Sequence, residues 1–241
     1  MKLKVFLSLL LFLALYPLNA VGGCHKQTRI AIIDTGLDLQ DPRFQNHLCK
    51  TGHKNFLPDE GRWDINGHGT HVAGLIKQYA GDADYCILVY RFYSEQDPGK
   101  HNLDREILSI KEAIKNKATI INLSEGGPEF IEEEYLLIKN HPKITFVMAA
   151  GNDGKNLDIP GNEYYPGSYF LPNEKVVSSM GNNSMRSDFS NFSMKSEWEI
   201  GENVKSTLPF GRMGYMSGTS QAAAIFSGKL VDRLSRTCEY K

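Results

Sequence analysis

Short runs of consecutive apolar residues alternate along this chain with longer segments of helical periodicity. Runs of this length are typical of parallel strands that are buried on both faces of a sheet. This alternation predicts an α/β fold in three layers, with a mostly parallel central sheet and helices on both faces. The expected strands are 30–33, 86–90, 119–123, 144–149 and 175–179, and the expected helices are 68–79, 104–116, 132–140 and 221–234.

Chain length and charge limit the class of protein. A chain of 241 residues with 41% hydrophobic content can bury one sizeable core, and no repeat or low-complexity segment divides it. We therefore expect a single folded domain. The formal net charge is -1 and the basic residues form no stripe, so electrostatic attraction to nucleic acid is weak. We expect no nucleic-acid partner.

The beginning of the chain has a pattern of its own. Two lysines precede an apolar run over residues 5–16, and the small residue Ala20 follows. This pattern predicts a secretory signal peptide over residues 1–20, because a transmembrane helix needs about 20 apolar residues. The folded domain would then be 24–241, in a secreted or periplasmic protein without a transmembrane segment. The alternative is a lipoprotein signal that ends at residue 23 and leaves a lipidated, membrane-anchored Cys24.

How the four cysteines pair depends on whether the chain carries a secretory signal peptide or a lipoprotein signal. In an oxidising compartment they can form two disulfides, with three connectivities that the sequence does not rank. They are Cys24, Cys49, Cys86 and Cys238. If Cys24 carries a lipid, one of the others has no partner, and Cys86 could then be a buried free thiol within its apolar run. No Cys-x-x-Cys spacing indicates a zinc or redox centre.

Three segments place a carboxylate, an imidazole and a hydroxyl beside small residues that let a substrate backbone approach. They are Ile32-Ile33-Asp34-Thr35-Gly36, Gly67-His68-Gly69-Thr70-His71-Val72-Ala73-Gly74 and Ser217-Gly218-Thr219-Ser220. The carboxylate follows an expected strand, and the imidazole and the hydroxyl each precede an expected helix. Because parallel strands present their carboxyl ends at one edge of a sheet, we expect a site at that edge.

In this order, Asp34, His68 and Ser220 resemble the catalytic triad of the subtilisin-like serine proteases, peptidase family S8. Segment 120–127 is similar to the substrate-binding strand of that family, and segment 147–152 to the strand that leads to its oxyanion asparagine. The resemblance covers nearly all of the chain after the first thirty residues. It implies a subtilisin-like fold and a serine endopeptidase that cleaves proteins or peptides.

The resemblance also implies a role for each residue. Ser220 would be the nucleophile, His68 the general base and then the general acid, and Asp34 the group that orients the imidazole. The Asn152 side chain and the Ser220 backbone N–H would bind the oxyanion. An extended substrate would pair with Ser124, Glu125, Gly126 and Gly127.

Catalysis by these residues requires no cofactor or metal, and we expect a monomer. His68 and His71 are three apart on an expected helix and could share a cation, but no carboxylate is spaced as a third ligand. We therefore expect His71 to pack or to form a local hydrogen bond. Segment 79–85 is too short for the calcium-binding loop of many relatives, so no calcium site is expected there. Structural calcium elsewhere stays open.

Some residues differ from the family pattern. Glu125 stands where the family often has an apolar residue, which suggests a hypothesis that basic substrate side chains are preferred.

Other differences bear on activity. Gln221 and Ala224 replace a methionine and a proline. Only a short segment separates the expected cleavage site from Asp34, which leaves no room for a prodomain. The rival hypothesis is therefore a weak or inactive subtilase-like binding protein. A third alternative is an aspartic protease that uses Asp34 and does not need Ser220.

Overall fold

The computed structural model describes residues 27–57, 64–93 and 100–239. A parallel sheet of seven strands forms the centre, in the order β2-β3-β1-β4-β5-β6-β7. The strands are β1 (Thr28–Asp34), β2 (Lys54–Asn55), β3 (Tyr85–Arg91), β4 (Ile120–Leu123), β5 (Thr145–Ala149), β6 (Glu174–Met180) and β7 (Glu197–Ile200). An antiparallel hairpin follows, formed by β8 (Val204–Thr207) and β9 (Met213–Met216).

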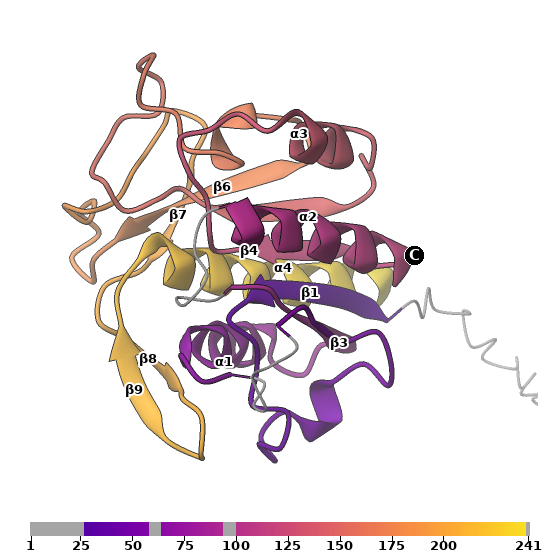
Figure 1. Ribbon diagram of the computed structural model, residues 1–241. Coiled ribbons are helices and arrows are strands. Elements are labelled where there is room, and N and C mark those ends of the chain that lie inside the picture. The colour runs from indigo at the N-terminus through magenta and orange to yellow at the C-terminus, as the bar shows by residue number, and fades with distance from the viewer. Residues whose placement is uncertain (1–26, 58–63, 94–99, 240–241) are drawn as a thin grey trace, which may run out of the picture.

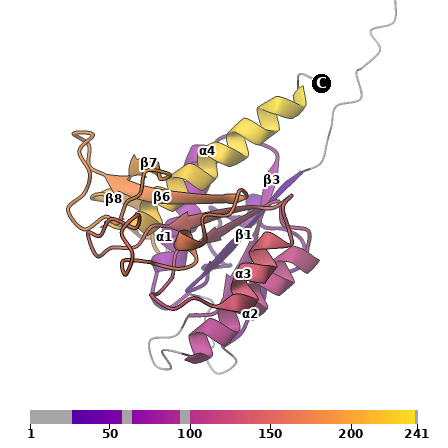
Figure 2. The same cartoon turned by 90° about the horizontal axis from the view of Figure 1, so that it is seen from above.

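Helices cover both faces of the sheet (Figures 1 and 2). Helices α1 (His68–Ala80) and α4 (Thr219–Glu239) pack on one face, and α2 (Lys100–Lys115) and α3 (Glu132–Lys139) on the other. Two short 3-10 helices, η1 (Gln45–His47) and η2 (Gly167–Tyr169), lie in the connections. The predicted three-layer α/β fold is therefore confirmed.

The core follows the alternation of side chains along the central strands. In β1, Ile30 and Ile32 point to the layer of α1 and α4, whereas Ala31 and Ile33 point to the layer of α2 and α3. All four are at most 1% exposed. Because both faces of β1 are covered, its apolar run is uninterrupted, and this is the pattern that predicts it.

The predicted strands and helices are all present, with shifted ends. Helix α2 begins at Lys100 and α4 extends to Glu239. Four strands were not predicted, namely β2, β7, β8 and β9. They are two to four residues long and contain many exposed or half-exposed positions, so they lack the apolar run that predicts a buried strand.

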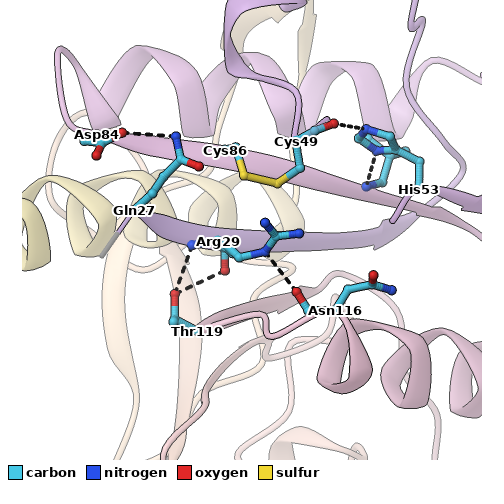
Figure 3. The surroundings of a disulfide bond; sticks show 9 residues. Gln27, Arg29, Cys49, His53, Asp84, Cys86, Asn116 and Thr119 are labelled. Atoms are coloured by element: carbon cyan, nitrogen blue, oxygen red, sulfur yellow. Dashed lines mark hydrogen bonds between the residues drawn. A yellow bond between two sulfur atoms is a disulfide. The ribbon is translucent and has the colours of Figure 1, made fainter. Parts of the chain in front are cut away.

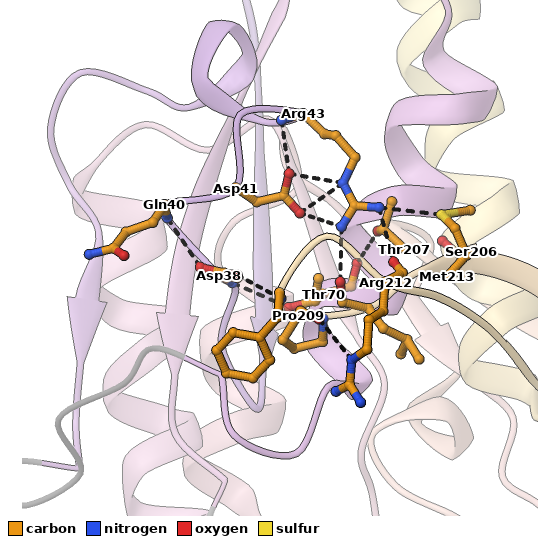
Figure 4. A network of polar contacts seen from close by, with 12 residues as sticks. Asp38, Gln40, Asp41, Arg43, Thr70, Ser206, Thr207, Pro209, Arg212 and Met213 are labelled. Carbon is orange, nitrogen blue, oxygen red and sulfur yellow. Dashed lines mark hydrogen bonds and ion pairs between the residues drawn. The ribbon is translucent and has the colours of Figure 1, made fainter.

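An arginine fixes the β8–β9 hairpin to the segment after β1 (Figure 4). The Arg43 guanidinium pairs with the buried Asp41 carboxylate and donates to the carbonyls of Leu208 at 2.9 Å and Arg212 at 3.0 Å. One side chain thus bridges two segments that are far apart in sequence. The tip of the hairpin is thus held against the segment that follows β1.

The hairpin also packs directly on helix α1. Ser206 and Thr207 each donate a side-chain hydrogen bond of 2.8 Å to a carbonyl in the first turn of α1, those of His71 and Thr70. A Cβ atom on Gly74 would lie 2.1 Å from Thr207 Oγ1, so only glycine permits this approach. The hairpin and helix α1 therefore form one packed unit beside the start of α4.

A disulfide joins Cys49 to Cys86 (Figure 3). Cys86 lies in β3, Cys49 follows η1, and both are 4% exposed. The adjacent His53 imidazole contacts the Cys49 carbonyl at 2.7 Å and accepts from the Val89 N–H at 3.1 Å. The pairing selects one of the three connectivities, so a free Cys86 thiol is wrong. Cys24 lies outside the described residues, so neither a second disulfide between Cys24 and Cys238 nor a lipidated Cys24 is tested.

Replacing both cysteines, in a Cys49→Ala/Cys86→Ala chain, should lower the free energy of unfolding. The bond closes a loop with a sequence separation of 37, and chain-entropy arguments for a loop of this size give about 4 kcal/mol. Urea unfolding of both chains, followed by tryptophan fluorescence, measures the difference. Equal unfolding midpoints, with the disulfide verified by mass spectrometry in the unmodified chain, would contradict the expectation.

Candidate active site

The motif residues meet at the carboxyl edge of the parallel sheet. Asp34 ends β1, Ser124 follows β4 directly, and Asn152 lies shortly after β5. His68 is the first residue of α1, and Ser220 is the second residue of α4. A pocket of about 380 Å³ opens there, lined by His68, Ser124, Glu125, Asn152, Tyr164, Met216, Ser217, Gly218, Ser220 and Gln221. The structure thus brings these residues together at the sheet edge where the site was predicted.

A buried carboxylate holds the His68 ring. His68 Nδ1 lies 2.8 Å from Asp34 Oδ1, and the Asp34 side chain is 1% exposed. Burial disfavours the charged imidazolium and so lowers the pKa of His68. The attraction of Asp34 outweighs this effect. With smaller contributions from Glu125 and Asp64, the pKa of His68 is raised to about 9. The hydrogen bond fixes the tautomer with a proton on Nδ1 and leaves Nε2 free to act in the pocket.

A second buried carboxylate, which the sequence interpretation missed, positions the start of α1. Asp64 accepts from the backbone N–H groups of Gly67 at 2.7 Å and Thr70 at 2.8 Å, and from the Thr35 hydroxyl at 3.1 Å. The first N–H groups of a helix have no partner within the helix, so Asp64 satisfies donors that would otherwise be unpaired. The sequence signal for this role is that Asp64 stands three residues before Gly67, the glycine that precedes the helix.

Close backbone contact also fixes α1 against β1. A Cβ atom on Gly69 would lie 2.0 Å from the Gly36 carbonyl oxygen, so any side chain there would push the helix away. In addition, the Gly69 N–H donates to Thr35 Oγ1 at 2.8 Å. The glycines of the two motifs thus set the separation between the carboxylate and the imidazole.

Ser220 lies at the amino terminus of α4, where the helix dipole favours negative charge. Its side chain faces the pocket, and its Oγ donates to the Ser124 carbonyl at 3.3 Å. Within the described part of the chain, Ser220 and His68 share no hydrogen bond. The Ser220 hydroxyl is instead directed toward the Ser124 carbonyl.

The orientation of Asn152 is set by Thr219. Asn152 Oδ1 accepts from the Thr219 N–H at 2.9 Å and from the Thr219 hydroxyl at 3.1 Å. The Thr219 oxygen in turn accepts from the Gly151 N–H at 3.1 Å. Because the carbonyl end of the amide is occupied, its NH₂ end is the part that can donate into the pocket beside Ser220. This is the arrangement that an oxyanion donor requires.

The segment after β4 forms one wall of the pocket. Gly127 and Tyr165 exchange two backbone hydrogen bonds of 2.7 and 2.8 Å, and the Ser124 hydroxyl accepts from Asn122 Nδ2 at 3.0 Å. Glu125 lies between these anchored positions and lines the pocket. Burial and the charge of Asp34 raise the pKa of Glu125 to about 7, and the nearby His68 partly offsets this effect.

His71 has a structural role. It is buried, as expected for a packed residue, and its Nε2 lies 3.1 Å from the carbonyl of Val204, a hairpin residue far away in the sequence. Burial lowers the pKa of His71 to about 4, so the ring is neutral near pH 7. Across the described residues, no three side chains of His, Cys, Asp or Glu are grouped to hold a metal ion.

Comparison with known proteins agrees with this geometry. The chain matches the subtilase family over residues 25–236. The major intracellular serine protease of Bacillus subtilis strain 168 is 35% identical over 229 residues, which cover 88% of this chain and 69% of that protein. Subtilisin NAT of Bacillus subtilis subsp. natto is 30% identical over 232 residues, which cover 91% of this chain and 58% of that protein.

A solved structure shows the same fold. The crystal structure of a cold-adapted subtilisin-like serine proteinase superimposes with a TM-score of 0.74 at 25% identity, covering 88% of this chain and 76% of that one. Sequence, fold and the arrangement of residues at the sheet edge all agree. The chain belongs to the subtilase family of serine peptidases.

Proposed function

We propose that this chain is a serine endopeptidase in which Asp34, His68 and Ser220 form the catalytic triad. The observation that carries the proposal is the 2.8 Å contact between the buried Asp34 carboxylate and His68 Nδ1 at the mouth of the pocket that also contains Ser220 and Asn152. A histidine whose tautomer is fixed by a buried carboxylate, beside a serine at a helix amino terminus, is the arrangement that nucleophilic catalysis by serine uses.

The mechanism follows from these positions. Ser220 Oγ attacks the carbonyl carbon of the scissile peptide while its proton passes to His68 Nε2. Asp34 stabilises the imidazolium that forms. The tetrahedral oxyanion accepts hydrogen bonds from the Asn152 amide and the Ser220 backbone N–H. His68 then gives its proton to the leaving amine, and water hydrolyses the acyl-enzyme by the same route.

The substrate would bind as an extended strand along the wall formed by residues 124–127. Backbone groups of this segment supply affinity that does not depend on substrate sequence, and side chains at its edge supply selectivity. Gly126 permits the backbone of Tyr165 to lie close to this wall, since a Cβ there would lie 2.4 Å from the Tyr165 carbonyl oxygen. A protein or peptide chain is therefore the substrate class that the site fits.

We further propose that the protein is exported. The Cys49–Cys86 disulfide supports an oxidising compartment, and the predicted signal peptide lies outside the described residues. Some relatives are named as intracellular enzymes. Throughout the described ranges, every helix is too short or too polar to span a bilayer.

Mass spectrometry of the native protein distinguishes the export routes. A chain that begins after residue 20 is the expected result, because the small Ala20 ends the predicted signal. A diacylglyceryl mass on an amino-terminal Cys24 would establish the lipoprotein alternative. An intact Met1, in protein purified from the native organism, would contradict export.

Labelling with a fluorophosphonate probe tests the activity itself. We expect the purified wild-type chain to be labelled and to hydrolyse unfolded casein, and both signals to vanish in the Ser220→Ala chain, because the probe reacts only with an activated serine. Loss of the nucleophile from a triad lowers turnover by about 10⁶-fold.

Circular dichroism of both chains provides the control for folding. A folded wild-type chain that neither labels nor cleaves would favour the binding-protein alternative. Cleavage that persists without Ser220 would instead favour an aspartic protease that uses Asp34.

The pH profile tests the environment of His68. The ring must be neutral to accept a proton, so kcat/KM should rise with pH through a pKa of about 9, the value that Asp34 maintains against burial. Glu125 and Asp64 also raise this pKa. The Glu125→Gln chain should therefore show its rise at lower pH.

Glu132→Gln is the matched control for this experiment, because Glu132 is exposed on α3 and lies outside the pocket. Its profile should coincide with that of the wild type when a neutral peptide is the substrate. A wild-type rise near the ordinary histidine pKa of about 6.5 would contradict the ion pair, and identical profiles in all three chains would contradict the role of Glu125.

A further inference from the structure

The ring of Tyr164 lies between the two backbone segments that border the pocket. A Cβ atom on Gly126, in the wall after β4, would lie 2.6 Å from Tyr164 Cε1. A Cβ atom on Gly151, in the segment after β5, would lie 3.0 Å from both Cγ and Cδ1 of the same ring. Tyr164 also lines the pocket together with Glu125 and Asn152. One phenol ring therefore fills the space between the two segments.

The proposed mechanism brings one substrate side chain to this space. The scissile carbonyl lies at Ser220 with its oxygen directed to the Asn152 amide, and the chain that precedes it runs along residues 124–127. The residue that supplies the carbonyl therefore has the wall on one side and the segment that carries Asn152 on the other. Its side chain, which immediately precedes the scissile bond, meets Tyr164 between them.

The position of Tyr164 is fixed by hydrogen bonds and by packing. Its N–H donates to Ser168 Oγ at 2.9 Å, and its carbonyl accepts from the Ser168 N–H at 2.9 Å. The next residue, Tyr165, exchanges two backbone hydrogen bonds with Gly127 of the wall. The Tyr164 side chain packs against a small apolar cluster formed by Ala150, Leu157 and Val176. A substrate side chain that displaced the ring would have to break these contacts.

The segment on the other side of the ring is anchored as well. Asn191 Oδ1 accepts from the backbone N–H groups of Asp153 at 3.1 Å and Lys155 at 2.8 Å. The Asn191 amide donates to the Ala150 carbonyl at 3.0 Å. A single side chain thus restrains both ends of residues 150–155. Because both segments are tied down, the space between them does not widen to admit a second large group beside the ring.

We propose that Tyr164 is a specificity-determining residue that restricts the substrate position immediately before the scissile bond to small side chains such as alanine, glycine or serine. The inference rests on the proposed function, because it specifies the substrate of the same pocket. Tyr164 acts by its volume, so a large apolar side chain and an arginine are rejected alike. The hypothesis of a basic preference at Glu125 predicts the opposite, and one series of substrates decides between them.

Substrates that differ in one side chain test the restriction. Four tetrapeptide aminomethylcoumarins carry alanine, leucine, phenylalanine or arginine before the cleaved bond, with alanine at the other positions. We expect kcat/KM for the alanine substrate to exceed that for each of the others by about tenfold or more, because even one methylene group in an apolar pocket changes kcat/KM by about 10- to 200-fold. Equal values, or a preference for any of the larger residues, would overturn the proposal.

Two variants of Tyr164 separate the volume of the ring from its hydroxyl group. Tyr164→Ala should raise the phenylalanine-to-alanine ratio of kcat/KM by about tenfold or more, because it opens the space between Gly126 and Gly151. Tyr164→Phe keeps the ring and should keep the wild-type ratio. An unchanged ratio in Tyr164→Ala, or an equal shift in both variants, would overturn a role for the ring.

Tyr135→Ala is the matched control. Tyr135 belongs to α3, packs against Phe130 and Tyr169, and is not among the residues that line the pocket. Loss of this ring should leave the wild-type ratio, and a shift as large as that of Tyr164→Ala would overturn the assignment to Tyr164. Circular dichroism verifies that each chain is folded. If Tyr164→Ala does not fold, Tyr164→Leu replaces it, with a shift in the same direction expected.

Two readouts separate this inference from the proposed function. Fluorophosphonate labelling and cleavage of any of the four substrates establish the protease, so activity with a preference for a large residue rejects only the role of Tyr164. If the wild-type chain neither labels nor cleaves, fluorescence anisotropy with the Ser220→Ala chain compares labelled peptides that end in alanine or in phenylalanine. Tighter binding of the alanine peptide would retain the restriction, and any other result would reject it.

Discussion

The contact between Asp34 and His68 is the interaction on which the site depends. It joins the end of β1 to the start of α1, so the two layers of the fold must be correctly spaced before it can form. Its energy also depends on pH. Because the folded pKa of His68 lies above its unfolded value of about 6.5, the pair stabilises the fold fully below that pH and loses this contribution as the pH rises through about 9. The protonated ring that stabilises the fold cannot act as the general base.

The geometry of this pair is maintained by residues outside the proposed triad. Gly69 permits the helix to approach the Gly36 carbonyl, and Asp64 and Thr35 satisfy the N–H groups of the first helical turn. On the other side of α1, hydrogen bonds from the hairpin complete the support. The imidazole is therefore restrained from two directions, which is the preorganisation that catalysis requires.

The sequence predicts those parts of the fold and site whose signal is local. Apolar runs identify the buried strands, and Asp34, His68 and Ser220 stand in motifs with characteristic neighbours. Strand β7 and the hairpin were not predicted, because their exposed positions interrupt the apolar pattern. The burial of Glu106 in α2 and Glu134 in α3 was not predicted for another reason. A glutamate in a helix ordinarily lies on the solvated face, and only the packing of α2 and α3 against the sheet shows that these two are buried.

Glu125 connects the wall of the pocket to the Asp34–His68 pair. It lines the pocket, and its charge contributes to the raised pKa of His68. Burial and the charge of Asp34 raise the pKa of Glu125 itself to about 7. The two groups therefore titrate as a coupled pair, because loss of the proton from Glu125 stabilises the imidazolium of His68 and moves the appearance of the neutral ring to higher pH.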